Sequence, residues 1–133
     1  MAEMGFNWHE LMSRDPDASQ RFYEEVTGVS FVSVDAAGDY RLILVGGRPV
    51  AGMTGPRSAQ GEWPSGGPQG HWVAYFDSDD VDTATRRTQE LGGEVLVEPV
   101  DIPGSGRAAV LRDPDGATFG VFRAALPPTA STP

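Results

Sequence analysis

The sequence predicts an α+β fold in which two βαβββ modules pair into one curved sheet with the helices outside. Three observations support this prediction. A strand–helix–strand–strand–strand pattern occurs twice in 133 residues, with an offset of 65 that places Asp15 on Asp80 and Gly28 on Gly93. A segment rich in glycine and proline separates the copies. Each copy alone is too short to bury a good core, so the copies are expected to pair.

The first module is expected at residues 6–53. Its helix begins after Asp15, which caps the first amides, and has Pro16 at the first helical position. Apolar residues then recur at helical spacing up to Gly28, which suits a C-terminal cap. Strands are expected at residues 6–12, 29–34, 39–45 and 48–53, where β-branched and aromatic residues gather between turn-forming residues.

Residues 54–70 are predicted to be a linker, because glycine and proline are frequent there and no period is visible. The second module is expected at residues 71–123, with a helix that starts at Asp79-Asp80 and closes at Gly92-Gly93. Its strands are expected at residues 71–76, 94–97, 107–112 and 118–122. Residues 1–125 would form one domain, and the proline-rich tail 126–133 is expected to be disordered.

Composition narrows the possible functions. The chain has no cysteine, no lysine and two histidines, His9 and His71, which excludes disulfides, thiol nucleophiles and Schiff-base chemistry. The net charge of −9 repels phosphate backbones and anionic lipids, so neither nucleic acid nor a membrane is an expected partner. No apolar run reaches membrane-span length and no signal peptide is visible, so a cytoplasmic location is expected.

Four signatures follow one another in order. They are Asp15 through Phe22-Tyr23 to Gly28, then Gly70-His71-Trp72, Gly92-Gly93, and Asp113-Pro114-Asp115-Gly116. Together they resemble the vicinal oxygen chelate superfamily, which includes glyoxalases, extradiol dioxygenases and bleomycin resistance proteins. The resemblance covers residues 6–123 and implies a cup-shaped mixed sheet with helices outside, usually in a homodimer. It does not specify an activity, because the superfamily includes several chemistries and pure binding proteins.

In metal-dependent enzymes of this superfamily, the resemblance implies, four strand residues hold a divalent metal. The corresponding positions here are Trp8, Ala51 or Gly52, His71 or Val73, and Gly120. Only His71 can be a ligand, and a single imidazole does not make a zinc, iron or nickel site. Glu10 shares a strand face with Trp8 and could replace one ligand, but the site would still lack donors. We therefore expect no metal and no cofactor.

Alternation along the strands predicts an aromatic and apolar cup with few polar groups. Gly52 and Gly120 are expected to leave room for a ligand. Such a pocket suits a flat, largely apolar molecule that stacks on aromatic rings. The candidate ligand-binding residues are Trp8, Glu10, Met12, Trp63, His71, Val73, Tyr75, Arg107, Gly120 and Phe122, and no catalytic residue is assigned.

Several of these residues also have structural interpretations. Trp8 could belong to the core, and His71 could be a hydrogen-bonded structural histidine. Glu10 could pair with Arg107 or another arginine. Trp63 could either close over a ligand or anchor the linker to the body.

Other residues are expected to be structural. Trp72 and Phe76 fall on the opposite strand face from the cup and are expected in the core under the second helix. His9 is expected to pack against a helix or an interface. The acidic residues between positions 77 and 82 lack the spacing of a calcium-binding loop, so helix capping and solvation are expected.

Three functions remain open. The first is metal-independent binding and sequestration of a hydrophobic aromatic small molecule, expected to be a natural-product antibiotic, which would give drug resistance. The second is an enzyme of the same superfamily, either a glyoxalase-like lyase or isomerase or a dioxygenase, or a metal-free enzyme that uses Glu10 and His71 as acid and base. The third is a structural or regulatory partner that acts as a dimer platform.

Overall fold

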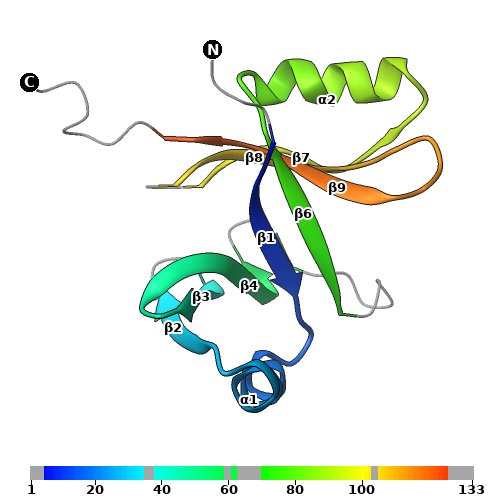
Figure 1. Cartoon of the computed structure of the whole chain (residues 1–133). Helices are drawn as coiled ribbons and strands as arrows, with labels where there is room; N and C mark the ends of the chain where they lie inside the picture. Colours follow the sequence, from blue (N-terminus) through cyan, green and yellow to red (C-terminus); the bar gives the residue numbers. More distant parts are fainter. Residues whose placement is uncertain (1–4, 35–37, 59–60, 63–69, 103–104, 126–133) are drawn as a thin grey trace, which may run out of the picture. The chain divides into compact units, whose positions relative to one another are not determined.

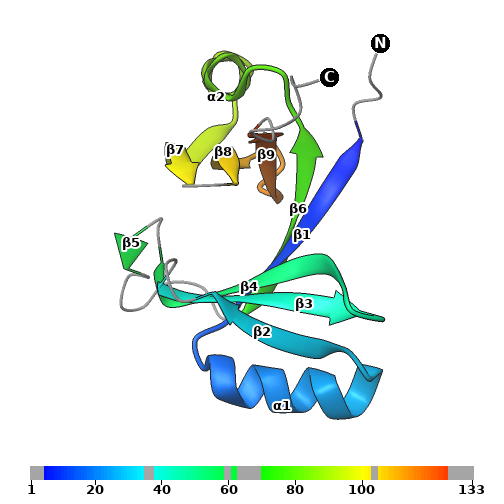
Figure 2. The same ribbon diagram turned by 90° about the vertical axis from the view of Figure 1, so that its left-hand side faces the viewer.

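The computed structural model describes residues 5–34, 38–58, 61–62, 70–102 and 105–125. The chain forms two compact units, which are described separately (Figures 1 and 2). The α1 unit comprises residues 8–74, and the α2 unit comprises residues 1–7 and 75–133. Trp63 and the expected tail at residues 126–133 lie outside the described residues.

The α1 unit contains the first predicted module. Its strands run in the order β2-β3-β4-β1, with β1 parallel to β4 and β2, β3 and β4 antiparallel to their neighbours. A short strand, β5, pairs with β4. The elements are β1 (Phe6–Met12), whose first two residues belong to the α2 unit, α1 (Pro16–Thr27), β2 (Ser30–Val34), β3 (Gly38–Val45), β4 (Arg48–Ser58) and β5 (Gly61–Glu62).

The α2 unit repeats this arrangement. Its strand order is β6-β9-β8-β7, with β6 parallel to β9 and the other pairs antiparallel. In both units the first strand of the module therefore lies parallel beside the last. The elements are β6 (His71–Asp77), whose first four residues belong to the α1 unit, α2 (Val81–Glu90), β7 (Glu94–Ile102), β8 (Gly106–Arg112) and β9 (Thr118–Ala124).

Both helices begin at the predicted caps. The Asp15 carboxylate accepts a hydrogen bond from the amide of Ala18 at 3.2 Å, and the Asp80 carboxylate accepts from the amide of Thr83 at 3.0 Å. These bonds satisfy amides that have no partner within the helix. Helix α1 ends at Gly28, whose φ of 78° is the left-handed conformation that glycine adopts without a Cβ clash.

Each helix covers one face of its own strands (Figure 2). In the α1 unit, the core contains Leu11, Ile43, Ala51 and Met53, with Tyr23, Val29 and Phe31 packed against it. In the α2 unit, it contains Val81, Ala109, Leu111 and Val121, with Ala84, Val95 and Phe119 packed against it. These residues come from alternate strand positions, as a sheet with one helix-covered face requires.

The linker begins later than predicted. Strand β4 continues to Ser58, and β5 occupies two further residues of the expected linker. Strand β7 likewise continues to Ile102 instead of ending at Val97, although it contains Pro99. This strand lies at the edge of its unit and its register with β8 shifts between Val97 and Val100, so the missing amide of Pro99 is tolerated. Turn-forming residues were therefore a poor guide to these two strand ends.

The predicted α+β class and the two βαβββ modules are confirmed, and parallel and antiparallel pairs together make a mixed sheet. Within the described residues, neither helix has the length and apolar character needed to cross a membrane.

Candidate functional site

A buried carboxyl group lies on the strand face opposite α1. Glu10 on β1 is 7% exposed and lies beside Gly52 of β4. Its Oε1 accepts hydrogen bonds from Nε1 of Trp8 at 2.9 Å and from the hydroxyl of Tyr40 at 3.4 Å. Its Oε2 accepts from Oγ1 of Thr54 at 2.9 Å. Three strands of the α1 unit therefore supply donors to one acid.

The environment of Glu10 opposes its ionisation. Burial raises its pKa from 4.5 to about 7, while the hydrogen bonds from Thr54, Trp8 and Tyr40 hold the pKa down to a smaller extent. Desolvation favours the neutral acid, and donors that point at the oxygens favour the carboxylate. Glu10 can thus exchange a proton near neutral pH. The hydrogen-bond donors to Glu10 are not arginines, so the alternative in which Glu10 pairs with Arg107 or another arginine is wrong.

Two members of this network were missed by the sequence analysis. Tyr40 lies opposite Thr54 in the pairing of β3 with β4, so both side chains share the face of Glu10. Thr54 falls within the predicted linker at residues 54–70, and so outside the strand expected at residues 48–53, whereas the structure places it in β4. Strand alternation continued by two residues beyond Gly52 would have found it.

Gly52 does not leave an open space, contrary to expectation. A Cβ at this position would overlap the Tyr40 hydroxyl and would lie 2.7 Å from Oε2 of Glu10. The absent side chain is replaced by a tyrosine from the neighbouring strand. Glycine is required here because the acid and the phenol approach the β4 backbone closely.

The same correction applies to Gly120 in the α2 unit. This residue of β9 lies beside Tyr75 of β6, and a Cβ on Gly120 would overlap the tyrosine ring. Tyr75 is 4% exposed, so its ring fills the space that the glycine opens. Neither glycine therefore provides room for a ligand in this structure.

The remaining predicted site residues vary in accessibility. Val73 is 1% exposed and presents almost no surface to a ligand. Trp8, Met12, His71 and Phe122 are half-buried, so part of each side chain reaches the surface. Trp8 is therefore both accessible and fixed through its bond to Glu10. His9 is exposed, on the strand face opposite Glu10.

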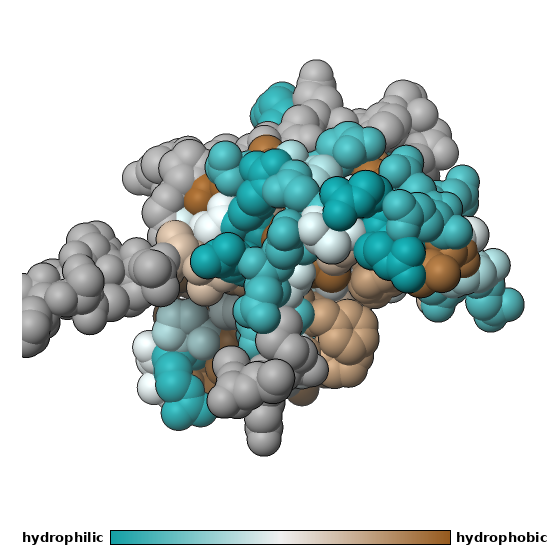
Figure 3. Space-filling view, turned by 90° about the horizontal axis from the view of Figure 1, so that it is seen from above, coloured by the Kyte–Doolittle hydropathy of each residue, from teal (hydrophilic) through white to brown (hydrophobic). Residues whose placement is uncertain are grey.

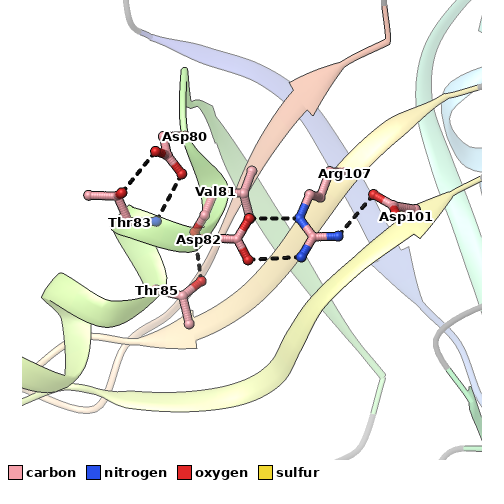
Figure 4. A network of polar contacts seen from close by, with 7 residues as sticks. All are labelled: Asp80, Val81, Asp82, Thr83, Thr85, Asp101 and Arg107. Atoms are coloured by element: carbon pink, nitrogen blue, oxygen red, sulfur yellow. Dashed lines mark hydrogen bonds and ion pairs between the residues drawn. The ribbon is translucent and has the colours of Figure 1, made fainter.

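Arg107 belongs to a different network, in the α2 unit (Figure 4). Its Nε and Nη2 donate to the two carboxylate oxygens of Asp82 at 3.0 and 2.8 Å, and its Nη1 donates to Asp101 at 2.9 Å. It therefore connects the first turn of α2 to β7 and β8. Beside it, Asp80 caps the helix, and the Thr83 bonds hold the pKa of that carboxyl below its usual value. Helix capping by the acidic segment is confirmed.

Trp72 is not core under the second helix. It is 45% exposed, lies in the α1 unit, and donates from Nε1 to the Tyr23 hydroxyl of α1 at 3.2 Å. Its ring also contacts that of Tyr23 edge to face. An apolar hollow of about 230 Å³ opens there, lined by Tyr23, Thr27, Val29, Ile43, Val50, Ala51 and Trp72.

Phe76 also differs from the expectation that it lies in the core under the second helix. Phe76 is 38% exposed, and its ring contacts Phe119 at 6.0 Å between centroids. Phe6 stacks on Phe76 at 4.2 Å. Both phenylalanines belong to the α2 unit.

The residues at the positions that hold a metal in metal-dependent members do not fit a metal here. Tryptophan and glycine have no ligand atom, and the space beside each glycine is filled by a tyrosine ring or hydroxyl. Across the residues that the structure describes, no three His, Cys, Asp or Glu side chains form a group that could hold an ion. We therefore derive no step that passes through a metal at these positions.

Comparison with known proteins agrees with the fold. Residues 5–121 match the Glyoxalase/Bleomycin resistance protein/Dioxygenase superfamily. The chain belongs to this superfamily. It is 41% identical over 120 residues to CFP32 of Mycobacterium tuberculosis, which bears a glyoxylase name. It is 36% identical over 130 residues to the anthracycline biosynthesis protein DnrV of Streptomyces peucetius.

These matches cover 89% and 87% of this chain but only 43% and 46% of the relatives. The chain thus spans less than half the length of the curated relatives it matches.

Solved structures share the fold at low sequence identity. Methylmalonyl-CoA epimerase from Mycobacterium tuberculosis matches with a TM-score of 0.60 and 17% identity, over 92% of this chain and 89% of that one. A variant of homoprotocatechuate 2,3-dioxygenase from B. fuscum matches with a TM-score of 0.60 and 21% identity, over 93% of this chain and 33% of that one. These similarities concern the fold alone.

Proposed function

We propose that this protein binds a flat, hydrophobic aromatic natural product without a metal, on the strand face that carries Trp8 and Glu10. The observation that carries the proposal is the 2.9 Å bond from Nε1 of Trp8 to the buried Glu10. Because this bond restrains the indole before a ligand arrives, less conformational entropy is lost on stacking. The face supports binding by an ordered aromatic surface with a polar group beside it.

The ligand class is suggested by two kinds of observation. Relatives that are 36% and 35% identical to this chain are named for anthracycline biosynthesis. Anthracyclines contain a flat polycyclic quinone, which fits stacking on an indole. The surplus of acidic residues, which gives the net charge of −9, would also attract a ligand that carries an amino group. Sequestration of such a compound would protect the cell against it.

Calorimetric titration with an anthracycline and with its sugar-free aglycone tests this proposal. We expect binding of both, and Trp8→Ala should weaken it by about thirtyfold, as loss of a central aromatic contact does. Trp72→Ala is the matched control, because Trp72 contacts α1 on the other face and should leave the affinity unchanged. Absence of heat with both compounds would contradict the proposal. Equal affinities of Trp8→Ala and Trp72→Ala would also contradict it. The bound compound should be recovered chemically unchanged.

A second candidate is an enzyme that transfers a proton, and the environment of Glu10 favours it. A buried acid with a pKa of about 7 is suited to general acid–base catalysis at neutral pH. Mass spectrometry of the ligand after incubation distinguishes the two functions. Conversion of the ligand, lost in Glu10→Gln and retained in Trp72→Ala, would establish the enzyme. A ligand recovered unchanged would support sequestration.

A further inference from the structure

The apolar hollow of the α1 unit lies on the helix-covered face of its strands, opposite Glu10. Its floor is the cross-strand pair of Ile43 on β3 and Ala51 on β4, and both residues are buried. Its rim includes Val50 and Trp72, and both are exposed. The hollow therefore runs from the surface down to the core of this unit.

The repeat shows that the hollow is particular to α1. At the offset of 65, Gly28 after α1 corresponds to Gly93 after α2. A Cβ on Gly93 would overlap the backbone oxygen of Arg112 and would lie 2.7 Å from Cγ2 of Thr88, so the end of α2 is packed onto β8. The surface over α2 is also largely hydrophilic (Figure 3). A Cβ on Gly28 would meet no atom within 4 Å, and Tyr23, which lines the hollow, stands where α2 has Thr88.

The polar atoms of the lining side chains form hydrogen bonds within the wall of the hollow. Nε1 of Trp72 donates to the Tyr23 hydroxyl at 3.2 Å, and Oγ1 of Thr27 donates to the backbone oxygen of Tyr23 at 2.6 Å. The other lining side chains are valine, isoleucine and alanine, and no lining residue is charged. A water molecule in a cavity needs about two to four polar partners, which this lining does not offer. The hollow therefore favours an uncharged and largely apolar occupant.

Two rings at right angles favour an aromatic occupant. The ring planes of Tyr23 and Trp72 make an angle of 88°, with centroids 5.7 Å apart. A third ring that stacks on one of them is therefore perpendicular to the other. Offset stacking and edge-to-face contact are the two arrangements that aromatic rings prefer, so one bound ring can make both.

The volume of the hollow, about 230 Å³, limits the size of the occupant. An apolar cavity of about 150 Å³ is enough for benzene, whereas drug-sized ligands occupy pockets of about 300 Å³ or more. A single ring with small substituents is therefore the size that fits.

We propose that this hollow is a second ligand site, which takes a neutral compound with a single aromatic ring. The ring stacks on Trp72 above the floor of Ile43 and Ala51, and a polar substituent faces the opening, where it stays hydrated. A polycyclic anthracycline is too large for this volume. The site is separate from the face of Trp8 and Glu10, so binding here does not depend on whether that face binds a polycyclic compound.

Titration of methyl-labelled protein with phenol, followed by carbon–proton correlation NMR, tests this site. We expect the methyl signals of Ile43 and Ala51 to shift, because the ring current of a bound aromatic acts on methyl groups beside it. The shifts should saturate with a dissociation constant of about 1 mM, as suits so small a ligand. Cyclohexanol has the same number of non-hydrogen atoms and the same hydroxyl group but no aromatic ring, so it should bind about fivefold more weakly.

Two variants and one control locate the bound phenol. Ala51→Leu should fill the floor and abolish the shift of the Ile43 methyl signals. Trp72→Ala removes one of the two rings and should weaken binding about tenfold, and the exposed position of Trp72 should leave the chain folded. Phe76→Ala removes an exposed ring from the α2 unit and should leave the affinity for phenol unchanged.

Three outcomes would overturn the proposal. The first is the absence of shifts at Ile43 and Ala51 when phenol is present at ten times the expected dissociation constant. The second is equal affinity for phenol and cyclohexanol, which would show that the hollow does not select an aromatic ring. The third is equal affinity of the wild type and Trp72→Ala. Proton spectra show whether each variant is folded, and if Ala51→Leu is not, Trp72→Ala decides alone.

Discussion

Trp8 donates its indole hydrogen to Glu10 over 2.9 Å, which joins a half-buried ring to a buried acid. Both residues lie on β1, two positions apart, so the strand alone would place their side chains on one face. Thr54 and Tyr40 add donors from two other strands. The orientation of the aromatic surface therefore depends on the acid, and the protonation state of the acid depends on burial.

The first prediction concerns the effect of pH on stability through Glu10. Its folded-state pKa is about 7 and its ordinary value 4.5, so between these values the folded chain keeps a proton that the unfolded chain releases. The free energy of unfolding is therefore highest, as far as Glu10 is concerned, below pH 4.5. It falls as the pH rises to 7, by about 3 kcal/mol in total. Glu10→Gln should abolish this fall, as measured by urea unfolding across the window.

The exposed Glu98 provides the control for that experiment. Glu98→Gln should leave the pH dependence of the wild type in place, because its side chain is in water in both states. If the wild type and Glu10→Gln lose stability in parallel as pH rises, Glu10 does not titrate as inferred.

The second prediction concerns the close approach at Gly52. A methyl group would overlap the Tyr40 hydroxyl and approach Oε2 of Glu10 to 2.7 Å, so Gly52→Ala should lower the free energy of unfolding by about 1–3 kcal/mol. Tyr40→Phe removes the overlapping oxygen. The double variant should therefore lose less stability than the sum of the two single variants. Additive losses in chemical unfolding would show that the hydroxyl is not the obstacle.

The repeat and the helix caps were predictable because their signals are local. Asp15 and Asp80 determine where the helices start, because each accepts a hydrogen bond from an amide three residues later. These starts can therefore be predicted without knowing which distant residues lie nearby. The ends of β4 and β7 were not predictable in the same way. Pro99 is tolerated in β7 because that strand lies at the edge of its unit, which depends on strand order.

The site was only partly predictable from the sequence. Whether the space beside its glycines is open or filled depends on side chains that are distant in sequence. Trp8 and Glu10 follow from alternation on one strand, whereas the filling of Gly52 and Gly120 depends on Tyr40 and Tyr75. A glycine in a strand permits another group to approach its backbone closely. The sequence does not say whether that group is a ligand or a neighbouring side chain.

The third prediction follows from the contact at Gly120. Its missing side chain accommodates the ring of Tyr75, which is 4% exposed and cannot turn into solvent without unpacking. Gly120→Ala should therefore cost about 1–3 kcal/mol of folding free energy, measured by urea unfolding. Gly5→Ala is the matched control, because a Cβ at Gly5 meets no atom within 4 Å. Equal stability of the two variants would contradict the close packing at β9.

The fourth prediction separates Arg107 from the ligand. Its guanidinium bonds both oxygens of Asp82 and also Asp101, so it connects α2 with β7 and β8 (Figure 4). Arg107→Gln should lower the melting temperature and make it less sensitive to salt, because salt screens the ion pairs of the wild type. Arg87→Gln removes a pair within α2 alone and should change the melting temperature less. Affinity for an aromatic ligand should be the same in both variants. Weaker binding by Arg107→Gln would show that Arg107 contributes to ligand binding, and would contradict this prediction.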